Sequence, residues 1–116
     1  MKTDGMKDLA AISAMMRDRD LGRVEGIVAQ MRRIEAEAAA IREIRDQRLG
    51  QADLDASRLA GADPVWLAWA EERLARSMAQ LAQLRVSHEA ALGAARRSFG
   101  RAEATAALAR ITRPGG

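Results

Sequence analysis

Residues 61–69 read Gly-Ala-Asp-Pro-Val-Trp-Leu-Ala-Trp and contain the one strong break in a chain that otherwise favours helix. Gly61 suits the left-handed position at which a helix ends. Asp63 is a good N-cap because its carboxylate accepts hydrogen bonds from free amides, and Pro64 suits the first helical position. These residues therefore combine the end of one helix with the cap and the start of another. Because similar lengths of helix-forming sequence lie on both sides, they predict the tip of a helical hairpin.

The composition predicts an all-α fold, a long antiparallel two-helix coiled-coil hairpin. The chain has 116 residues, of which only 3% are aromatic. Alanine, leucine, arginine and glutamate dominate, which is typical of long helices that pair without a wide core. We expect a single hairpin over residues 1–116, with a first arm over about 6–60, a tip at 61–63, a second arm over about 64–111 and a mobile tail at 112–116.

The first arm has apolar residues at alternating spacings of three and four, which indicate a coiled-coil seam. The seam comprises Val24, Ile27, Met31, Ile34, Ala38 and Ile41. Arg45 continues it, and we expect its stem to pack while its charged end reaches water. Upstream, a second apolar stripe consists of Leu9, Ile12 and Met16. Near Asp20 this stripe falls out of phase with the seam.

The second arm has two overlapping apolar tracks, so its apolar stripe is wider than a two-stranded seam. The first track is Leu67, Ala70, Leu74, Ser77, Leu81, Leu84, His88, Ala91 and Ala95. The second is Met78, Leu81, Arg85, His88, Leu92, Ala95, Phe99, Ala102 and Ala106.

Folding the arms about residues 61–63 predicts the register of the hairpin. It places Phe99 opposite Glu25 and Gly26, and Leu92 near Met31. The open end of the hairpin is rich in glycine and alanine on both arms, and small side chains bury little apolar area. We therefore expect this end to fray in isolation and to become ordered on binding.

No catalytic, cofactor-binding or metal-binding residues are predicted, and we do not expect an enzyme. Two paired helices offer no concave site, the chain has no cysteine, and no glycine-rich phosphate-binding motif is present. His88 is the only histidine and is expected to be a packed seam residue. No apolar run reaches the ~20 residues of a membrane span.

The candidate binding residues are aromatic and basic: Trp66, Trp69, Arg96, Arg97, Phe99 and Arg101. The tryptophans either cap the hairpin end against Leu59 and Leu67 or anchor a protein partner. The arginines belong to a basic C-terminal stretch, because from Arg96 onward there are five basic residues and one acidic residue. They either form a solvated face or contact an acidic partner.

The sequence Trp-Leu-Ala-Trp-Ala-Glu-Glu-Arg-Leu-Ala-Arg-Ser-Met-Ala-Gln-Leu, which follows Pro64-Val65, resembles the FliJ/YscO group. The similarity lies chiefly in residues 64–110, including Ala-Ala-Arg-Arg-Ser-Phe-Gly-Arg-Ala-Glu-Ala. The chain departs from that group in its shortness, its lack of tyrosine and its alanine-rich second arm. Members of the FliJ/YscO group are bacterial cytoplasmic proteins of flagellar and virulence-type (type III) export systems.

The resemblance implies a central-stalk protein that inserts into a hexameric export ATPase and regulates it, with further contacts to the export gate or to chaperones. It implies a cytoplasmic location at the membrane-bound export apparatus. The pore-facing part would be residues 6–31 with 92–111, and the tip would be left for a second partner. The alternatives are a general helical adaptor or export chaperone, and a basic coil associated with nucleic acid. The last reading lacks an aromatic platform or a recognition motif.

Overall fold

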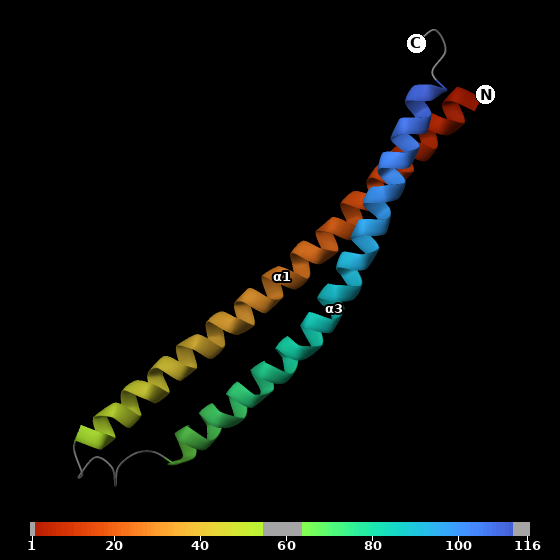
Figure 1. Cartoon of the computed structure of the whole chain (residues 1–116). Coiled ribbons are helices and arrows are strands. Elements are labelled where there is room, and N and C mark those ends of the chain that lie inside the picture. The colour runs from red at the N-terminus through yellow and green to blue at the C-terminus, as the bar shows by residue number, and fades with distance from the viewer. Residues whose placement is uncertain (1, 55–63, 113–116) are drawn as a thin grey trace. The chain divides into compact units, whose positions relative to one another are not determined.

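The fold is all-α, as predicted, and consists of two long helices packed against each other in an antiparallel hairpin. The structure, a computed structural model, describes residues 2–54 and 64–112 (Figure 1). They form α1 (Lys2–Leu54) and α3 (Pro64–Ile111). The bounds of α3 coincide with the predicted second arm. The predicted tip at 61–63 and the tail beyond Thr112 lie outside the described residues.

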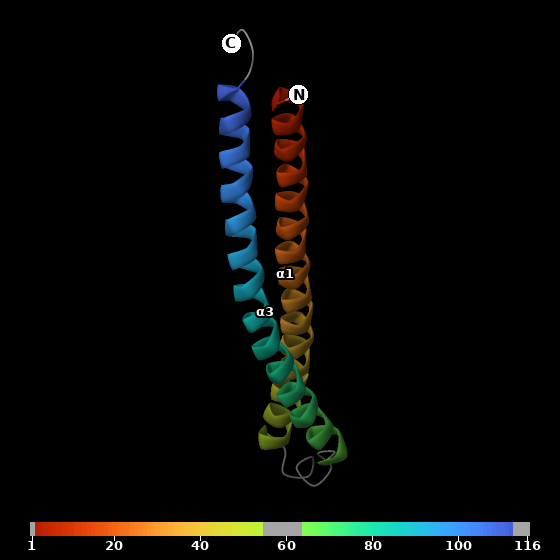
Figure 2. The same ribbon diagram turned by 90° about the vertical axis from the view of Figure 1, so that its right-hand side faces the viewer.

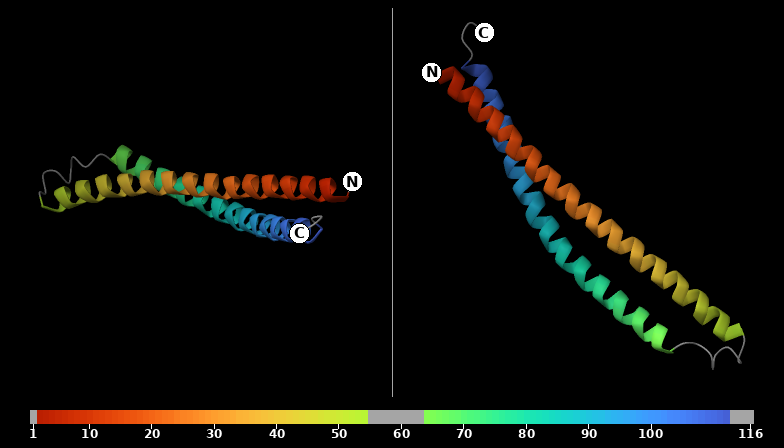
Figure 3. Two further views of the ribbon diagram at one scale, coloured as in Figure 1. Left: turned by 90° about the horizontal axis from the view of Figure 1, so that it is seen from above. Right: turned by 180° about the vertical axis from the view of Figure 1, so that it is seen from behind.

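The helices form two compact units. Unit 1 comprises residues 1–28 and 86–116, and unit 2 comprises residues 29–85. In unit 1 the N-terminal turns of α1 lie beside the C-terminal turns of α3 (Figure 2). In unit 2 the C-terminal turns of α1 pair with the N-terminal turns of α3 (Figure 3). The helices are therefore antiparallel within each unit, and each unit has its own core.

The face of α1 that packs on α3 keeps one seven-residue phase through both units. Its buried and half-buried positions are Met6, Ala10, Ser13, Arg17, Asp20, Val24, Ile27, Met31, Ile34, Ala38, Ile41 and Arg45. The predicted seam from Val24 to Ile41 is confirmed. Upstream, where the apolar stripe was expected to lose this phase, Leu9 and Ile12 are exposed and Met16 is half-buried, while the seam itself keeps its phase. A coiled coil selects positions by their period, and here the period places small and polar residues on the seam.

The seam of α3 is the first of the two predicted tracks. All nine of its members, from Leu67 to Ala95, are buried or half-buried, and the same phase continues through Ser98, Ala102, Thr105 and Ala109. The second track runs along the flank of this seam, and its large residues Met78 and Phe99 are exposed. The width of the apolar stripe therefore reflects one seam and one uncovered flank.

The two units differ in what their seams bury. In unit 2 most of the seam residues are large and aliphatic, and the seam comprises Met31, Ile34, Ala38, Ile41, Arg45, Leu67, Ala70, Leu74, Ser77, Leu81 and Leu84. In unit 1 most of the seam residues are small or polar, and the seam comprises Met6, Ala10, Ser13, Arg17, Asp20, Val24, Ile27, His88, Ala91, Ala95, Ser98, Ala102, Thr105 and Ala109. Buried apolar area stabilises a packed pair by about 25 cal/mol per Å², so unit 1 gains less from its seam than unit 2.

The register differs from the predicted one by about two helical turns. A reversal at residues 61–63 would place Ser98 opposite Gly26, but Ser98 bonds to Asp20, six residues away. The same reversal would place Glu71 opposite Asp53, but Glu71 bonds to Arg45, eight residues away. The prediction placed the reversal of the chain at residues 61–63. Both observed pairs lie closer to the N-terminus of α1 than that reversal would place them.

Amide exchange should be faster in unit 1 than in unit 2. The small and polar seam of unit 1 opens at a lower free-energy cost, so its amides, before about residue 30 and after about residue 95, should exchange first. Hydrogen exchange followed by mass spectrometry or NMR measures this directly. Equal protection along both helices would show that the difference in seam composition does not control local opening.

Shortening a seam leucine should destabilise the protein far more than shortening an exposed leucine of the same unit. Leu81 is 3% exposed and Leu49 is 42% exposed. We expect Leu81→Ala to lower the free energy of unfolding by ~2–3 kcal/mol, because it leaves a cavity between the helices. We expect Leu49→Ala to lower it by less than ~1 kcal/mol. Urea unfolding followed by circular dichroism gives both values, and similar losses would argue against the observed seam.

Candidate protein-binding site

A groove lies along one flank of unit 1 and contains two of the predicted binding residues. Its volume is about 510 Å³, and it is lined by Arg17, Asp18, Leu21, Leu92, Ala95, Arg96 and Phe99. Leu21 and Phe99 are 49% and 55% exposed. The expectation that a two-helix coil has no concave site is therefore wrong for this unit. The small seam residue Ala95 leaves the hollow, and the larger flanking side chains form its walls.

Phe99 does not lie opposite Gly26 as predicted. It shares the groove with Leu21 of α1, while the space that a Cβ atom on Gly26 would occupy is open. The shift in register described above accounts for the change of neighbour. Leu21 was not among the predicted binding residues, and only the correct register would have indicated it.

The arginines near Phe99 divide between two flanks of α3. Arg96 lines the groove, whereas Arg97 and Arg101 do not. Arg97 and Arg101 are one turn apart, so they share a side of the helix that differs from the side of Phe99. We call this pair the basic edge. Both residues are exposed, and within residues 2–54 and 64–112 neither forms an ion pair.

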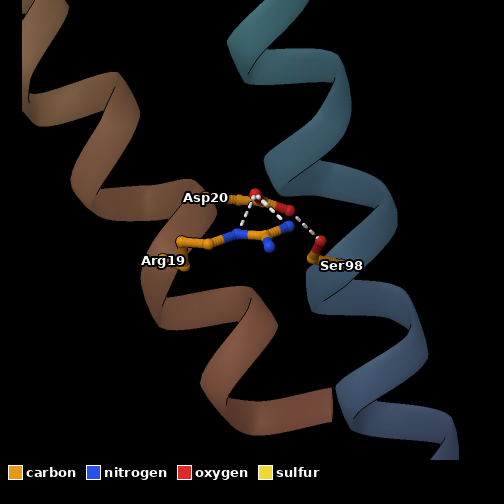
Figure 4. Close-up of polar contacts among 3 residues, drawn as sticks. All are labelled: Arg19, Asp20 and Ser98. Carbon is orange, nitrogen blue, oxygen red and sulfur yellow. Dashed lines mark hydrogen bonds and ion pairs between the residues drawn. The ribbon is translucent and has the colours of Figure 1, made fainter. Parts of the chain in front are cut away.

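A polar pair that the sequence did not reveal joins the helices of unit 1. The hydroxyl of Ser98 on α3 donates a hydrogen bond to Oδ2 of Asp20 on α1 (Figure 4). Arg19 donates to Oδ1 of the same carboxylate at 3.3 Å from Nη2 and 3.4 Å from Nε. The Asp20 side chain is only 15% exposed. Continuing the spacing of three and four upstream from Val24 would have placed Asp20 on the seam.

The surroundings of Asp20 lower the pKa of its carboxyl group from the ordinary value of 3.8. The hydrogen bond from Ser98 is the largest cause, because it stabilises the charged form. Desolvation acts in the opposite direction, and the positive charges of Arg19 and Arg101 add to the lowering. Asp20 therefore stays ionised on a partly buried seam, and the basic edge contributes to the field that it experiences.

Unit 2 contains the other two candidate binding residues, Trp66 and Trp69. Their ring centroids are 6.2 Å apart and their planes are tilted by 44°, a geometry that favours aromatic contact. The guanidinium of Arg48 lies 4.0 Å from the ring centroid of Trp66, which is a cation–π contact. Trp66 is half-buried and Trp69 is 50% exposed. Trp69 is therefore the more accessible member. Leu59, the other expected neighbour, lies outside the described residues.

Arg45, the charged residue expected on the seam of α1, lies there with its stem packed. Its guanidinium group forms ion pairs with Glu71 and Asp46. Nη1 lies 2.9 Å from Oε1 of Glu71 on α3, and Nε lies 3.3 Å from Oδ1 of Asp46. The hydrogen bond to Glu71 is the main reason why the pKa of Arg45 is raised. A second cross-helix ion pair in unit 2 joins Arg73 and Glu37 at 3.6 Å.

The described residues contain no cluster of histidine, cysteine, aspartate or glutamate placed to hold a metal ion. His88 is half-buried on the seam of α3. Neither helix, over its described length, has a segment apolar enough to cross a lipid bilayer.

Comparison with known proteins gives no match: no family model, no curated protein and no solved structure is similar enough to indicate a family. The resemblance noted in the sequence therefore enters the functional argument only as a proposal.

The stability of the protein should depend on pH through Asp20 and Ser98. A carboxyl group whose pKa is lowered by folding stabilises the fold above its unfolded pKa, and this contribution is lost as the pH falls through the folded pKa. We therefore expect a loss of stability as the pH falls below about 4. In Ser98→Ala the pKa of Asp20 should be higher and this acid-induced loss smaller, which NMR titration and unfolding at several pH values will measure.

Ser13→Ala is the matched control, because Ser13 is also a buried serine on the seam of unit 1. Its removal should leave the titration of Asp20 unchanged. An unchanged titration in Ser98→Ala as well would show that the hydroxyl does not stabilise the Asp20 carboxylate.

Proposed function

We propose that this chain is a non-enzymatic central-stalk or adaptor protein of a type III export apparatus, flagellar or injectisome, that inserts into a hexameric export ATPase and regulates it. The partner comes from the resemblance of residues 64–110 to the FliJ/YscO group. Contacts with an export gate or with chaperones belong to the same proposal.

The observation that carries the proposal is the basic edge of Arg97 and Arg101. Residues 86–116 contain five arginines and two glutamates, while the acidic and basic residues of the remaining chain balance. The net charge of +3 thus belongs to this segment. Both residues of the basic edge are exposed and, among the described residues, without an ion-pair partner. An acidic protein surface would be attracted to them and oriented by them.

The packing of unit 1 agrees with a binding role. Its seam consists mainly of alanine and serine, so the two helices gain little from each other and their ordering depends on further contacts. A partner that surrounds this pair would supply those contacts, as in other cases where binding and ordering are coupled. Unit 1 also contains most of the segments that the resemblance assigns to the ATPase pore.

The test is a binding and turnover assay with the hexameric export ATPase of the same bacterium. We expect a complex and a changed rate of ATP hydrolysis. Arg97→Glu with Arg101→Glu should weaken binding about tenfold or more, because it replaces attraction by repulsion. Arg32→Glu with Arg33→Glu makes the same change of charge at exposed positions of unit 2 and should bind like the wild type.

The outcomes separate the candidate functions. Absence of both binding and any change in ATP hydrolysis would rule out the stalk proposal. A stable complex with an export substrate or another helical protein, without an effect on turnover, would favour the general adaptor or chaperone instead. Equal weakening by both double variants would show that binding depends on net charge and not on the basic edge.

A further inference from the structure

We propose that the groove of unit 1 binds the same groove of a second copy of this chain, so that two copies form a four-helix contact along residues 17–21 and 92–99. The inference concerns the opposite flank of α3 from the basic edge, and it does not depend on the export ATPase. It starts from the position of the large apolar side chains in this unit.

Unit 1 buries small residues and exposes large ones. Its fully covered seam positions include Ser13, Ala91 and Ser98, whereas about half of the surface of Leu21 and Phe99 is exposed. A pair of helices can cover only one seam on each member. Side chains that flank that seam become core when a second pair of helices packs over them, as in a four-helix bundle. The groove is therefore the face on which another helical layer would bury the most apolar surface.

The charges at the rim of the groove favour a second copy as this layer. Arg17 and Asp18 line the groove from α1, and Arg96 lines it from α3. The only ion pair of Asp18 in the described ranges is with its neighbour Arg17, at 3.1 Å. Arg96 has no ion pair with any described residue. The wall from α1 therefore has a neutral Arg17–Asp18 pair and the wall from α3 has an arginine unpaired within the described residues, for which Asp18 of a second copy can act as a further acceptor.

A two-fold axis running along the groove makes this rim complementary to itself. It places α1 of one copy over α3 of the other, so that Asp18 faces Arg96 of the second copy, and the same pair forms a second time by symmetry. Leu21 then packs against the side of Phe99 and Leu92 of the second copy. Two ion pairs and a small apolar core come from five residues of each chain.

The size of the groove limits the strength of this contact. From Leu92 to Phe99 the groove follows α3 for about two turns, or ~10 Å. Stable complexes bury about 800 Å² on each partner, and smaller contacts are weak and transient. The expected dimer is therefore reversible and depends on concentration in the micromolar range. The basic edge stays outside this contact because it lies on the other flank of α3.

Sedimentation equilibrium of the full chain over about 5–500 μM tests the proposal, because this range brackets a micromolar dissociation constant. We expect a reversible monomer–dimer equilibrium. Leu21→Ser and Phe99→Ser should each raise the dissociation constant about tenfold or more, the loss expected for a central contact residue. Met15→Ser changes an exposed apolar residue of unit 1 that does not line the groove and should leave the constant unchanged. Circular dichroism will show that each variant is still folded.

A charge exchange tests the two-fold arrangement. Asp18→Arg alone and Arg96→Asp alone should each weaken the dimer, because like charges then face each other twice. A mixture of these two variants, or both changes in one chain, should restore association, because every facing pair is again opposite in sign. If the single variants lose association and neither the mixture nor the double variant restores it, the two-fold arrangement is wrong. A wild-type chain that stays monomeric at every concentration, as it would if a helix of another protein covered the groove, would overturn the proposal.

Discussion

The structure depends on one geometric constraint: a helix that pairs with a single partner can bury only one narrow seam. In α1 and α3 this seam follows an unbroken alternation of three and four residues. The constraint acts on positions and not on hydrophobicity, so alanine, serine and even Asp20 are covered where the period requires it. Large apolar residues at other positions, such as Phe99, can stay exposed. The chain therefore has more apolar surface than its two helices can cover.

The uncovered apolar surface and the net charge are distributed unevenly between the two units, and this distribution bears on function. Unit 2 combines a mostly aliphatic seam with cross-helix ion pairs from Arg45 and Arg73. Unit 1 has a seam of small and polar residues, a groove beside it and all of the net charge. A well-packed pair has little to gain from a partner, whereas a pair with a thin seam gains buried area and ordering together. The segment that contributes least to stability is thus the one best suited to binding.

Much of the fold could be predicted from the sequence, because its strongest signals are local. Pro64, predicted as the first helical residue, is where α3 begins, and simple spacing identified the seam of α3 from Leu67 to Ala95. The register could not be predicted from the break at residues 61–63 alone, because it follows from contacts between the helices, such as Ser98–Asp20 and Arg45–Glu71, that local sequence signals do not reveal. The candidate site was only partly predicted. Residue type singled out Phe99 and three arginines, but their division between two flanks follows from helical angles that a cluster in sequence conceals.

The hydrogen bond between Ser98 and Asp20 shows why a thin seam can still have a defined register. Alanine seams are nearly uniform, so sliding α3 by one heptad changes their apolar packing little. Asp20 breaks this uniformity. If α3 slid by one heptad so that Ala91 took the place of Ser98, the carboxylate of Asp20 would face a side chain without a hydrogen-bond donor. An unpaired charge on a seam is costly. If α3 slid by one heptad in the opposite direction, the carboxylate of Asp20 would face Thr105, whose hydroxyl already contacts the carbonyl oxygens of Arg101 and Ala102. A single polar residue on a coiled-coil seam can specify pairing at a cost in stability. In unit 1 that residue compensates for the missing leucines by selecting one alignment, and this alignment brings Leu21 and Phe99 to the same groove.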